Sequence, residues 1–488
     1  MRRPITVFAA ALLISLSVVI PFSGVVGAAV AADGAPTEQV GDGAPTEAVS
    51  VTRVGDGVRY DIRIAPPAGA ERAWLVVRGS ARVVERDGFE RVVGSAPTRL
   101  RWTGGEAAVS VVVPTNATDD ETAVGEAWAF TRTPFVELQW VADGAIERVW
   151  PLAQARNSLP ADAGAFGDRY ALVGDYETVT RSTPAGRVDL VVPAGAMSGP
   201  KAERVADSLA RAARDLDVGD RDESVLAFAA PGSVRWGGEA VPARDEFWTN
   251  ADSRLDSPEA VWLHEYVHTR QSFRVGPEMR WLREASAEYF AAQLAREQGL
   301  IDRGAVEAHL DGDPSTATLT DPATWASTDV PQRKGARTLA VLDRRIREQT
   351  YGQHSLADVI RRLNRHDGVV TYAEFEQTVA EITGEPDDTW LDRHVNGSAP
   401  VADQYGPDAR PLAASLLGRL GVADPGAGAT AGVVPATVRG EGAAFFVVAT
   451  GFSVLAALPL YGALRRRDRR ERPGEATGAT LSDRSRAT

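Results

Sequence analysis

The chain has 488 residues, no cysteine and a net charge of −13. This length allows two or three domains of about 100 to 200 residues, each able to bury its own core. The lack of cysteine excludes disulfide and zinc-thiolate frameworks. The acidic balance argues against nucleic-acid binding, because neutralising phosphates requires clustered Lys and Arg. Arginine supplies nearly all the positive charge beside abundant Asp and Glu, a balance typical of halophilic proteins or of GC-rich genomes.

The N-terminus has the pattern of a secretory signal. Two arginines precede an apolar run from Ile5 to Val30, and small residues end it before the chain turns polar at Asp33. This pattern predicts a cleaved signal peptide over residues 1–31. Residues 32–48 contain the sequence DGAPTE twice, which predicts a flexible linker.

Two different patterns of apolar residues follow the linker. Residues 49–185 consist of short valine-rich stretches broken by Gly, Pro and Asp, which predicts a β-sandwich-like domain. Residues 186–300 mix helical spacing with one buried strand, which predicts an α/β unit. Within it, Pro258 is expected to open a helix, and a second helix is expected over about 280–298. The fold class predicted for the whole chain is therefore multidomain α+β.

The first of these helices contains the sequence His264-Glu265-Tyr266-Val267-His268, an HExxH pattern. Residues four apart lie one turn above each other, so both imidazoles share one face and can bind one Zn²⁺ per chain. Glu265 beside them can act as the general base that takes a proton from water. The alternative is a surface helix that carries two unrelated histidines.

A catalytic zinc site needs a third protein ligand. A histidine six residues beyond His268 is excluded, because Arg274 stands there, so a carboxylate is expected. Glu284 and Glu288 lie one turn apart on the second predicted helix. Glu284 is the expected ligand, and Glu288 is expected to accept a hydrogen bond from a ligand imidazole. The alternative is a solvated acidic face, although the surrounding residues are unusually apolar.

These motifs resemble the gluzincin metallopeptidases, in which HExxH is followed by a WxxE segment that supplies the third zinc ligand. HEYVH and WLREASAEYF carry the resemblance, and the downstream segments KGA, LDRRIR, SLADV and VNG are similar to the glycyl aminopeptidase family, a relative of the aminopeptidase N family. The resemblance covers about residues 185–398. It implies a thermolysin-like zinc catalytic domain over 186–300 and a helical domain over 301–398.

The sequence departs from these families at two candidate substrate contacts. Gln332 stands where aminopeptidase N relatives have an oxyanion-stabilising tyrosine, and an amide could still donate a hydrogen bond there. The exopeptidase motif GxMEN is missing, and the nearest segment contains Glu239, which could hold a substrate amino group. His309, His354, His366 and His394 fit no ligand spacing and are expected to be ordinary surface or core residues.

The C-terminal part predicts a membrane anchor. Residues 399–440 are rich in Ala, Gly and Pro, as in a linker, and residues 443–464 are uncharged and long enough to cross a bilayer. The basic tail over 465–488 is expected to stay in the cytoplasm. The alternative for 443–464 is a buried core helix.

Together these features predict a membrane-anchored, extracellular zinc metallopeptidase. Its expected partners are a peptide or protein substrate and the membrane, with no nucleic acid. A catalytically impaired domain that binds polypeptides at the cell surface is the alternative.

Overall fold

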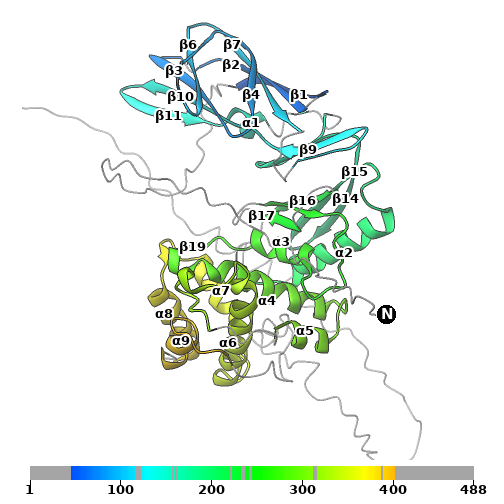
Figure 1. Ribbon diagram of the computed structural model, residues 1–488, viewed down its shortest axis with the longest axis vertical. Helices are drawn as coiled ribbons and strands as arrows, with labels where there is room; N and C mark the ends of the chain where they lie inside the picture. The colour runs from blue at the N-terminus through cyan, green and yellow to red at the C-terminus, as the bar shows by residue number, and fades with distance from the viewer. Residues whose placement is uncertain are drawn as a thin grey trace, which may run out of the picture. The chain divides into compact units, whose positions relative to one another are not determined.

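The computed structural model describes residues 46–401, except 56, 67, 116–121, 156–158, 160–162, 220–222, 232–236, 241–244, 311–315 and 386–387. The described chain has a multidomain α+β fold (Figure 1). No helix within the described ranges is long and apolar enough to span a membrane. The predicted signal peptide, transmembrane helix and basic tail all lie outside these ranges.

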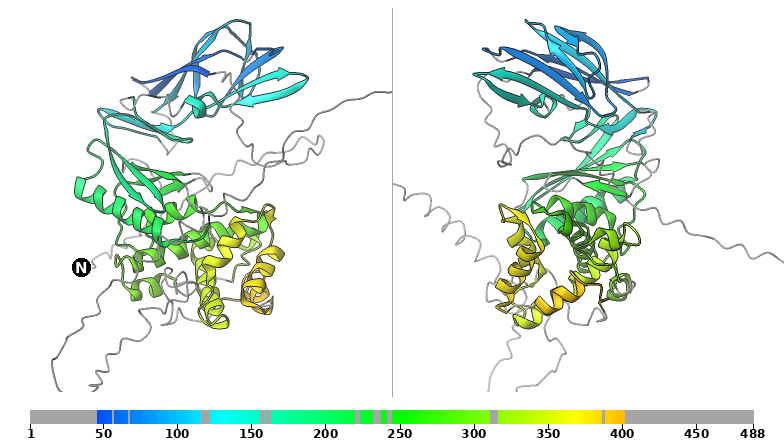
Figure 2. Two further views of the ribbon diagram at one scale, coloured as in Figure 1. Left: turned by 180° about the vertical axis from the view of Figure 1, so that it is seen from behind. Right: turned by 60° about the vertical axis from the view of Figure 1, so that its left-hand side comes forward.

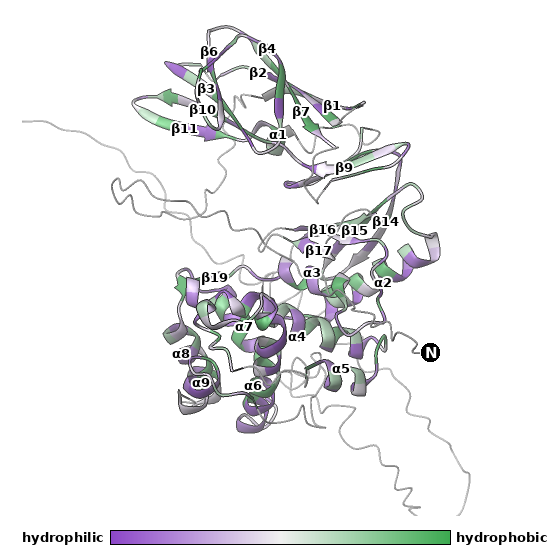
Figure 3. Cartoon of the chain, viewed as in Figure 1, coloured by the Kyte–Doolittle hydropathy of each residue, from purple (hydrophilic) through white to green (hydrophobic). Residues whose placement is uncertain are grey.

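Two antiparallel sheets share one core in the N-terminal part. The first has the order β1 (Thr46–Val54), β2 (Gly57–Ile64), β7 (Ala107–Pro114), β4 (Arg82–Asp87). The second has the order β11 (Ala145–Val149), β10 (Phe135–Ala142), β3 (Arg72–Arg78), β6 (Thr98–Trp102), β5 (Phe89–Arg91). Alternate side chains point inward, as Val58, Tyr60, Ile62 and Ile64 do along β2, so both sheets bury one face. Figure 3 shows the resulting alternation of hydrophobic and hydrophilic residues along these strands.

A third, smaller sheet packs on the mixed sheet that follows it in the chain. Its order is β12 (Ala165–Phe166), β13 (Tyr170–Gly174), β9 (Trp128–Arg132), β8 (Ala123–Val124), and the short helix α1 (Pro151–Ala155) precedes it in the chain. Phe130 of this sheet has its ring centroid 5.7 Å from that of Phe228 and 6.3 Å from that of Trp248. These aromatic contacts form a separate core between the third sheet and the sheet that follows.

The mixed sheet has five strands in the order β14 (Tyr176–Thr183), β15 (Gly186–Pro193), β16 (Ser224–Ala230), β18 (Glu246–Asn250), β17 (Gly238–Ala240). Strands β15, β16 and β18 are parallel, and helix α2 (Gly199–Asp215) connects β15 to β16. Helix α2 packs on one face of the sheet and the third sheet packs on the other, which explains the continuous apolar runs of these strands. Strand β17 is antiparallel and forms the edge.

Two buried helices follow the sheet and carry the sequence motifs. Helix α3 spans Val261–Thr269 and helix α4 spans Trp281–Glu297. The predicted start of α3 at Pro258 is wrong, because Ala260 adopts a left-handed conformation with φ of 38° and the helix begins after it. The short 3-10 turn Pro277–Met279 lies just before α4.

The remaining described elements are mainly helical. They are α5 (Arg303–Leu310), a 3-10 turn (Pro322–Thr324), a π-helical turn (Pro331–Gly335), α6 (Ala336–Gln349), α7 (Leu356–Asn364), α8 (Tyr372–Thr383), α9 (Asp388–His394), and the short parallel pair β19 (Arg274–Val275) and β20 (Val369–Val370). In both views of Figure 2 the yellow and orange helices pack beside the green helices α3 and α4.

Candidate metal centre

The two histidines of the HExxH motif converge on one face of α3. The Nε2 atoms of His264 and His268 are 3.2 Å apart, and their ring centroids are 4.9 Å apart. The side chains of His264 and His268 are 12% and 7% exposed, so both rings lie largely inside the protein. The i, i+4 spacing thus produces a pair of imidazoles that face one point.

Glu284 of α4 completes a set of three donor atoms. Its Oε2 lies 3.4 Å from His264 Nε2, and its Oε1 lies 3.6 Å from His268 Nε2. The three ligand atoms lie within 4.8 Å of one another. Two imidazoles and a carboxylate in this arrangement fit a catalytic zinc ion, whose fourth position stays open for water or substrate.

The electrostatics of this cluster favour a cation. Burial alone would lower the pKa of His264, but the carboxylates of Glu284 and Glu288 raise it well above its ordinary value. Burial alone would raise the pKa of Glu284, but the two histidines hold it well below its ordinary range. Positive charge is therefore stabilised where the three side chains meet.

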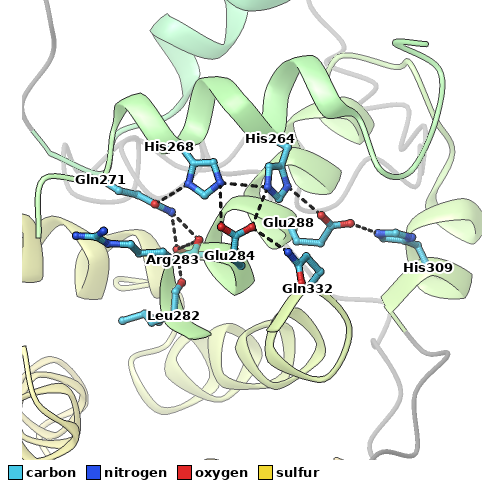
Figure 4. Close-up of polar contacts among 10 residues, drawn as sticks. His264, His268, Gln271, Leu282, Arg283, Glu284, Glu288, His309 and Gln332 are labelled. Atoms are coloured by element: carbon cyan, nitrogen blue, oxygen red, sulfur yellow. Dashed lines mark hydrogen bonds and ion pairs between the residues drawn. The ribbon is translucent and has the colours of Figure 1, made fainter. Parts of the chain in front are cut away.

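Each ligand imidazole is held by its other ring nitrogen (Figure 4). His264 Nδ1 donates to Glu288 Oε2 at 2.9 Å, the contact expected for Glu288. His268 Nδ1 donates to Gln271 Oε1 at 2.9 Å, and Gln271 Nε2 donates to the carbonyl of Arg283 at 2.8 Å. These bonds fix the tautomer that leaves both Nε2 atoms available to a metal.

His309 extends this network, although the sequence analysis expected it to be an ordinary surface or core residue. Its Nε2 donates to Glu288 Oε1 at 2.5 Å, so both oxygens of Glu288 are held by histidines. His309 lies on α5, and no local spacing connects it with the motif. Gln271 was also not predicted as part of the site. Its position three residues after His268 could have indicated a contact with that imidazole.

Glu265 occupies a buried position beside the ligands. The residue is 7% exposed, and burial raises the pKa of its carboxyl group to about 7. A Cβ added at Gly238 of the edge strand would lie 2.7 Å from Glu265 Cγ and 2.8 Å from its Oε1. The strand can approach Glu265 this closely because residue 238 has no side chain.

Gln332 contacts the ligand carboxylate. Its Nε2 donates to Glu284 Oε2 at 3.0 Å from the π-helical turn Pro331–Gly335. Its Oε1 is buried and has no hydrogen-bond partner within the described part of the chain. The amide thus reaches the metal centre, where it holds Glu284. A hydrogen bond to an oxyanion remains a prediction.

Glu239 lies on the edge strand next to Gly238, but two arginines engage its carboxylate. Arg132 Nη2 lies 3.2 Å and 2.9 Å from its two oxygens, and Arg169 Nη2 lies 3.6 Å from Oε1. Burial raises the pKa of Glu239 despite the charge of Arg169. The contact of Glu239 with a substrate amino group stays a prediction.

Comparisons with known proteins give matches among solved structures alone. The sequence matches no protein-family model and no curated protein. The fold is similar to an aminopeptidase N family protein from Idiomarina loihiensis, with 14% identity and a TM-score of 0.49 over 71% of this chain and 73% of that one. It is similar to the M1 zinc metallopeptidase from Deinococcus radiodurans, with 15% identity and a TM-score of 0.45 over 74% of this chain and 94% of that one.

A third similar structure is Legionella pneumophila aminopeptidase A in complex with aspartic acid. The identity is 11% and the TM-score 0.42 over 72% of this chain, which spans 49% of the length of that protein. The structural neighbours thus include proteins of the aminopeptidase N family, one of the families that the sequence motifs resemble.

Proposed function

We propose that the chain is a zinc metallopeptidase that hydrolyses peptide bonds. The observation that carries the proposal is the cluster of His264, His268 and Glu284 with a buried Glu265 beside it. A site that only stores metal or supports the fold has no use for a general base, whereas hydrolysis by activated water requires one.

Each residue of the metal centre has a distinct role in the proposed reaction. His264, His268 and Glu284 would hold the metal, which when bound supplies Lewis-acid activation of water and of the substrate carbonyl. Glu265 would accept the proton from water and pass it to the leaving amine. Glu288 and Gln271 would keep the two imidazoles oriented, and Gln332 would keep Glu284 in place.

The decisive comparison is between the wild-type chain and Glu265→Gln, purified at full length in high salt. We expect about one zinc per chain in both proteins, with hydrolysis of a mixed peptide pool reduced by about 10² to 10⁴ in the variant. Glu278→Gln, in the 3-10 turn between α3 and α4, is the matched control and should retain activity. A wild-type chain that binds no metal would refute the proposal.

The alternative function is a polypeptide-binding domain that has lost catalysis. Gln332 supports it, because one N–H of its amide is bound to Glu284, which leaves only the other N–H for an oxyanion. One zinc per chain together with no cleavage by the wild-type protein would favour this alternative.

We also propose that the peptidase faces the outside of the cell on a membrane anchor. The support is the uncharged sequence over 443–464 and the arginines that follow it. A chain truncated after residue 440 should appear in the medium, whereas the full chain should stay with membranes after carbonate washing. Full-length protein in the carbonate supernatant would refute the anchor.

A further inference from the structure

The edge strand β17 brings one carboxylate close to the proposed general base. Gly238 packs directly on Glu265, and Glu239 is the next residue along the strand. Glu239 is the only acidic residue in the sequence from Pro231 to Arg244. If this strand offers an anchor for the positive amino terminus of a peptide, Glu239 must provide it.

The structure shows that the charge of Glu239 is already compensated. The guanidinium of Arg132 contacts both carboxylate oxygens, at 3.2 Å and 2.9 Å, and Arg169 adds a second positive charge at 3.6 Å. Arg132 also lies over the ring of Tyr170, with its Cζ 5.9 Å from the ring centroid, which holds the guanidinium in place. The three side chains together carry a net charge of about +1.

A substrate ammonium group is poorly suited to this cluster. To reach Glu239 it would have to displace a guanidinium that contacts both oxygens, and it would still face a second arginine. These charges are between 28% and 43% exposed, so water can solvate a displaced group and the effect is a preference of moderate size. The cluster gives no gain to a peptide that presents a free amino terminus.

We infer that the peptidase proposed above, on whose activity this inference rests, cleaves peptides without requiring a free amino terminus. Its substrates are then internal peptide bonds and chains with blocked N-termini. Arg132 and Arg169 act as specificity-determining residues, because they neutralise the one carboxylate of the edge strand that could select for an amine.

The test uses two quenched fluorescent peptides of the same sequence, one with a free and one with an acetylated N-terminus. The full-length zinc-loaded chain should cleave both with kcat/KM values within about threefold of each other. The double variant Arg132→Gln/Arg169→Gln frees Glu239 and should favour the free peptide by about fivefold. In Glu239→Gln the ratio of the two rates should stay at its wild-type value.

Three results would overturn the inference. The first is wild-type cleavage of the free peptide alone. The second is an unchanged ratio in a folded double variant, judged by its circular dichroism and melting temperature. If wild type cleaves neither peptide, the proposed function fails and the inference fails with it. If the double variant does not fold, the ratio of the two peptides on wild-type protein still tests whether a free amino terminus is required.

Discussion

Two regions of the molecule place carboxylates in opposite electrostatic surroundings. In the metal centre, Glu284 and Glu288 face histidines, which lower the pKa of both groups. Where the third sheet meets the mixed sheet, Glu246 of β18 is 1% exposed and accepts a hydrogen bond from the backbone N–H of Arg169. Burial, with the nearby charge of Asp168, raises the pKa of Glu246 from 4.5 to about 7.

The difference shows how the environment of a carboxylate sets its protonation. Glu284 is surrounded by groups that become positive or that bind a cation together with it. Glu246 packs against Gly167, and its Oε2 has no hydrogen-bond partner within the described ranges, so no cation compensates that oxygen. The first environment suits a metal site and the second suits a neutral acid.

The largest effect is expected from removing the carboxylate ligand. Glu284→Ala leaves two imidazoles and should weaken zinc binding by more than about 100-fold, since loss of groups outside the ligand set alone costs about 10- to 100-fold. Competition with a chelator measures this affinity. Glu381→Ala, on α8 at an exposed ion pair with Arg362 of α7, should bind zinc as wild type does. Equal affinities of the two variants would remove Glu284 from the ligand set.

The next largest effect is expected in the pH dependence of stability, which tests the environment of Glu246. Folded Glu246 keeps its proton up to about pH 7, whereas the unfolded chain loses it near 4.5. Its stabilising contribution is therefore complete below about pH 4.5 and is lost as the pH rises through about 7. The side chain in Glu246→Gln stays neutral at every pH. The free energy of unfolding of this variant should exceed that of wild type by about 3 kcal/mol at pH 8, with little difference at pH 4.

Denaturant unfolding at the two pH values measures this effect. Glu177→Gln on the exposed side of β14 is the control, and its stability should differ little from that of wild type at either pH. A Glu246→Gln protein that is no more stable than wild type at pH 8 would contradict the assignment of Glu246 as a neutral acid.

A smaller effect on zinc affinity is expected from substituting His309, which tests its contact with Glu288. His309→Phe removes the donor to Glu288 Oε1 and should weaken zinc binding by about tenfold, because Glu288 then orients His264 less firmly. His309→Gln retains a donor and should recover part of the loss. His366→Phe is the matched control, since its ring lies 3.2 Å from Glu374, away from the metal ligands. Zinc affinities that agree among all four proteins would exclude a positioning role.

How much the sequence could predict depends on how local the signal is. His264, His268 and the paired carboxylates of α4 follow from spacing along single helices, and the structure brings these residues together. His309 comes from a separate helix, and the packing that places it against Glu288 leaves no periodic trace. The start of α3 was missed because a left-handed Ala260 is rare and composition does not reveal it.

Gln332 and Glu239 show that a sequence motif can identify a position without predicting its contacts. The sequence identified both positions but left their contacts open. The structure commits the Gln332 amide to Glu284, and it pairs Glu239 with an arginine from the third sheet. Pairing between sheets that lie far apart in sequence depends on tertiary packing, so a residue type at a motif position does not reveal which charge it meets.

Gln271 has a consequence for how the two helices that carry the metal ligands are held together. Its side chain joins the ring of His268 to the backbone of Arg283 and to Ser286 Oγ, so one residue ties helix α3 to helix α4 without using a metal bond. The buried tryptophans Trp262 and Trp281 add apolar packing to the same pair of helices. The two helices that carry the metal ligands are therefore joined by contacts that need no bond to the ion.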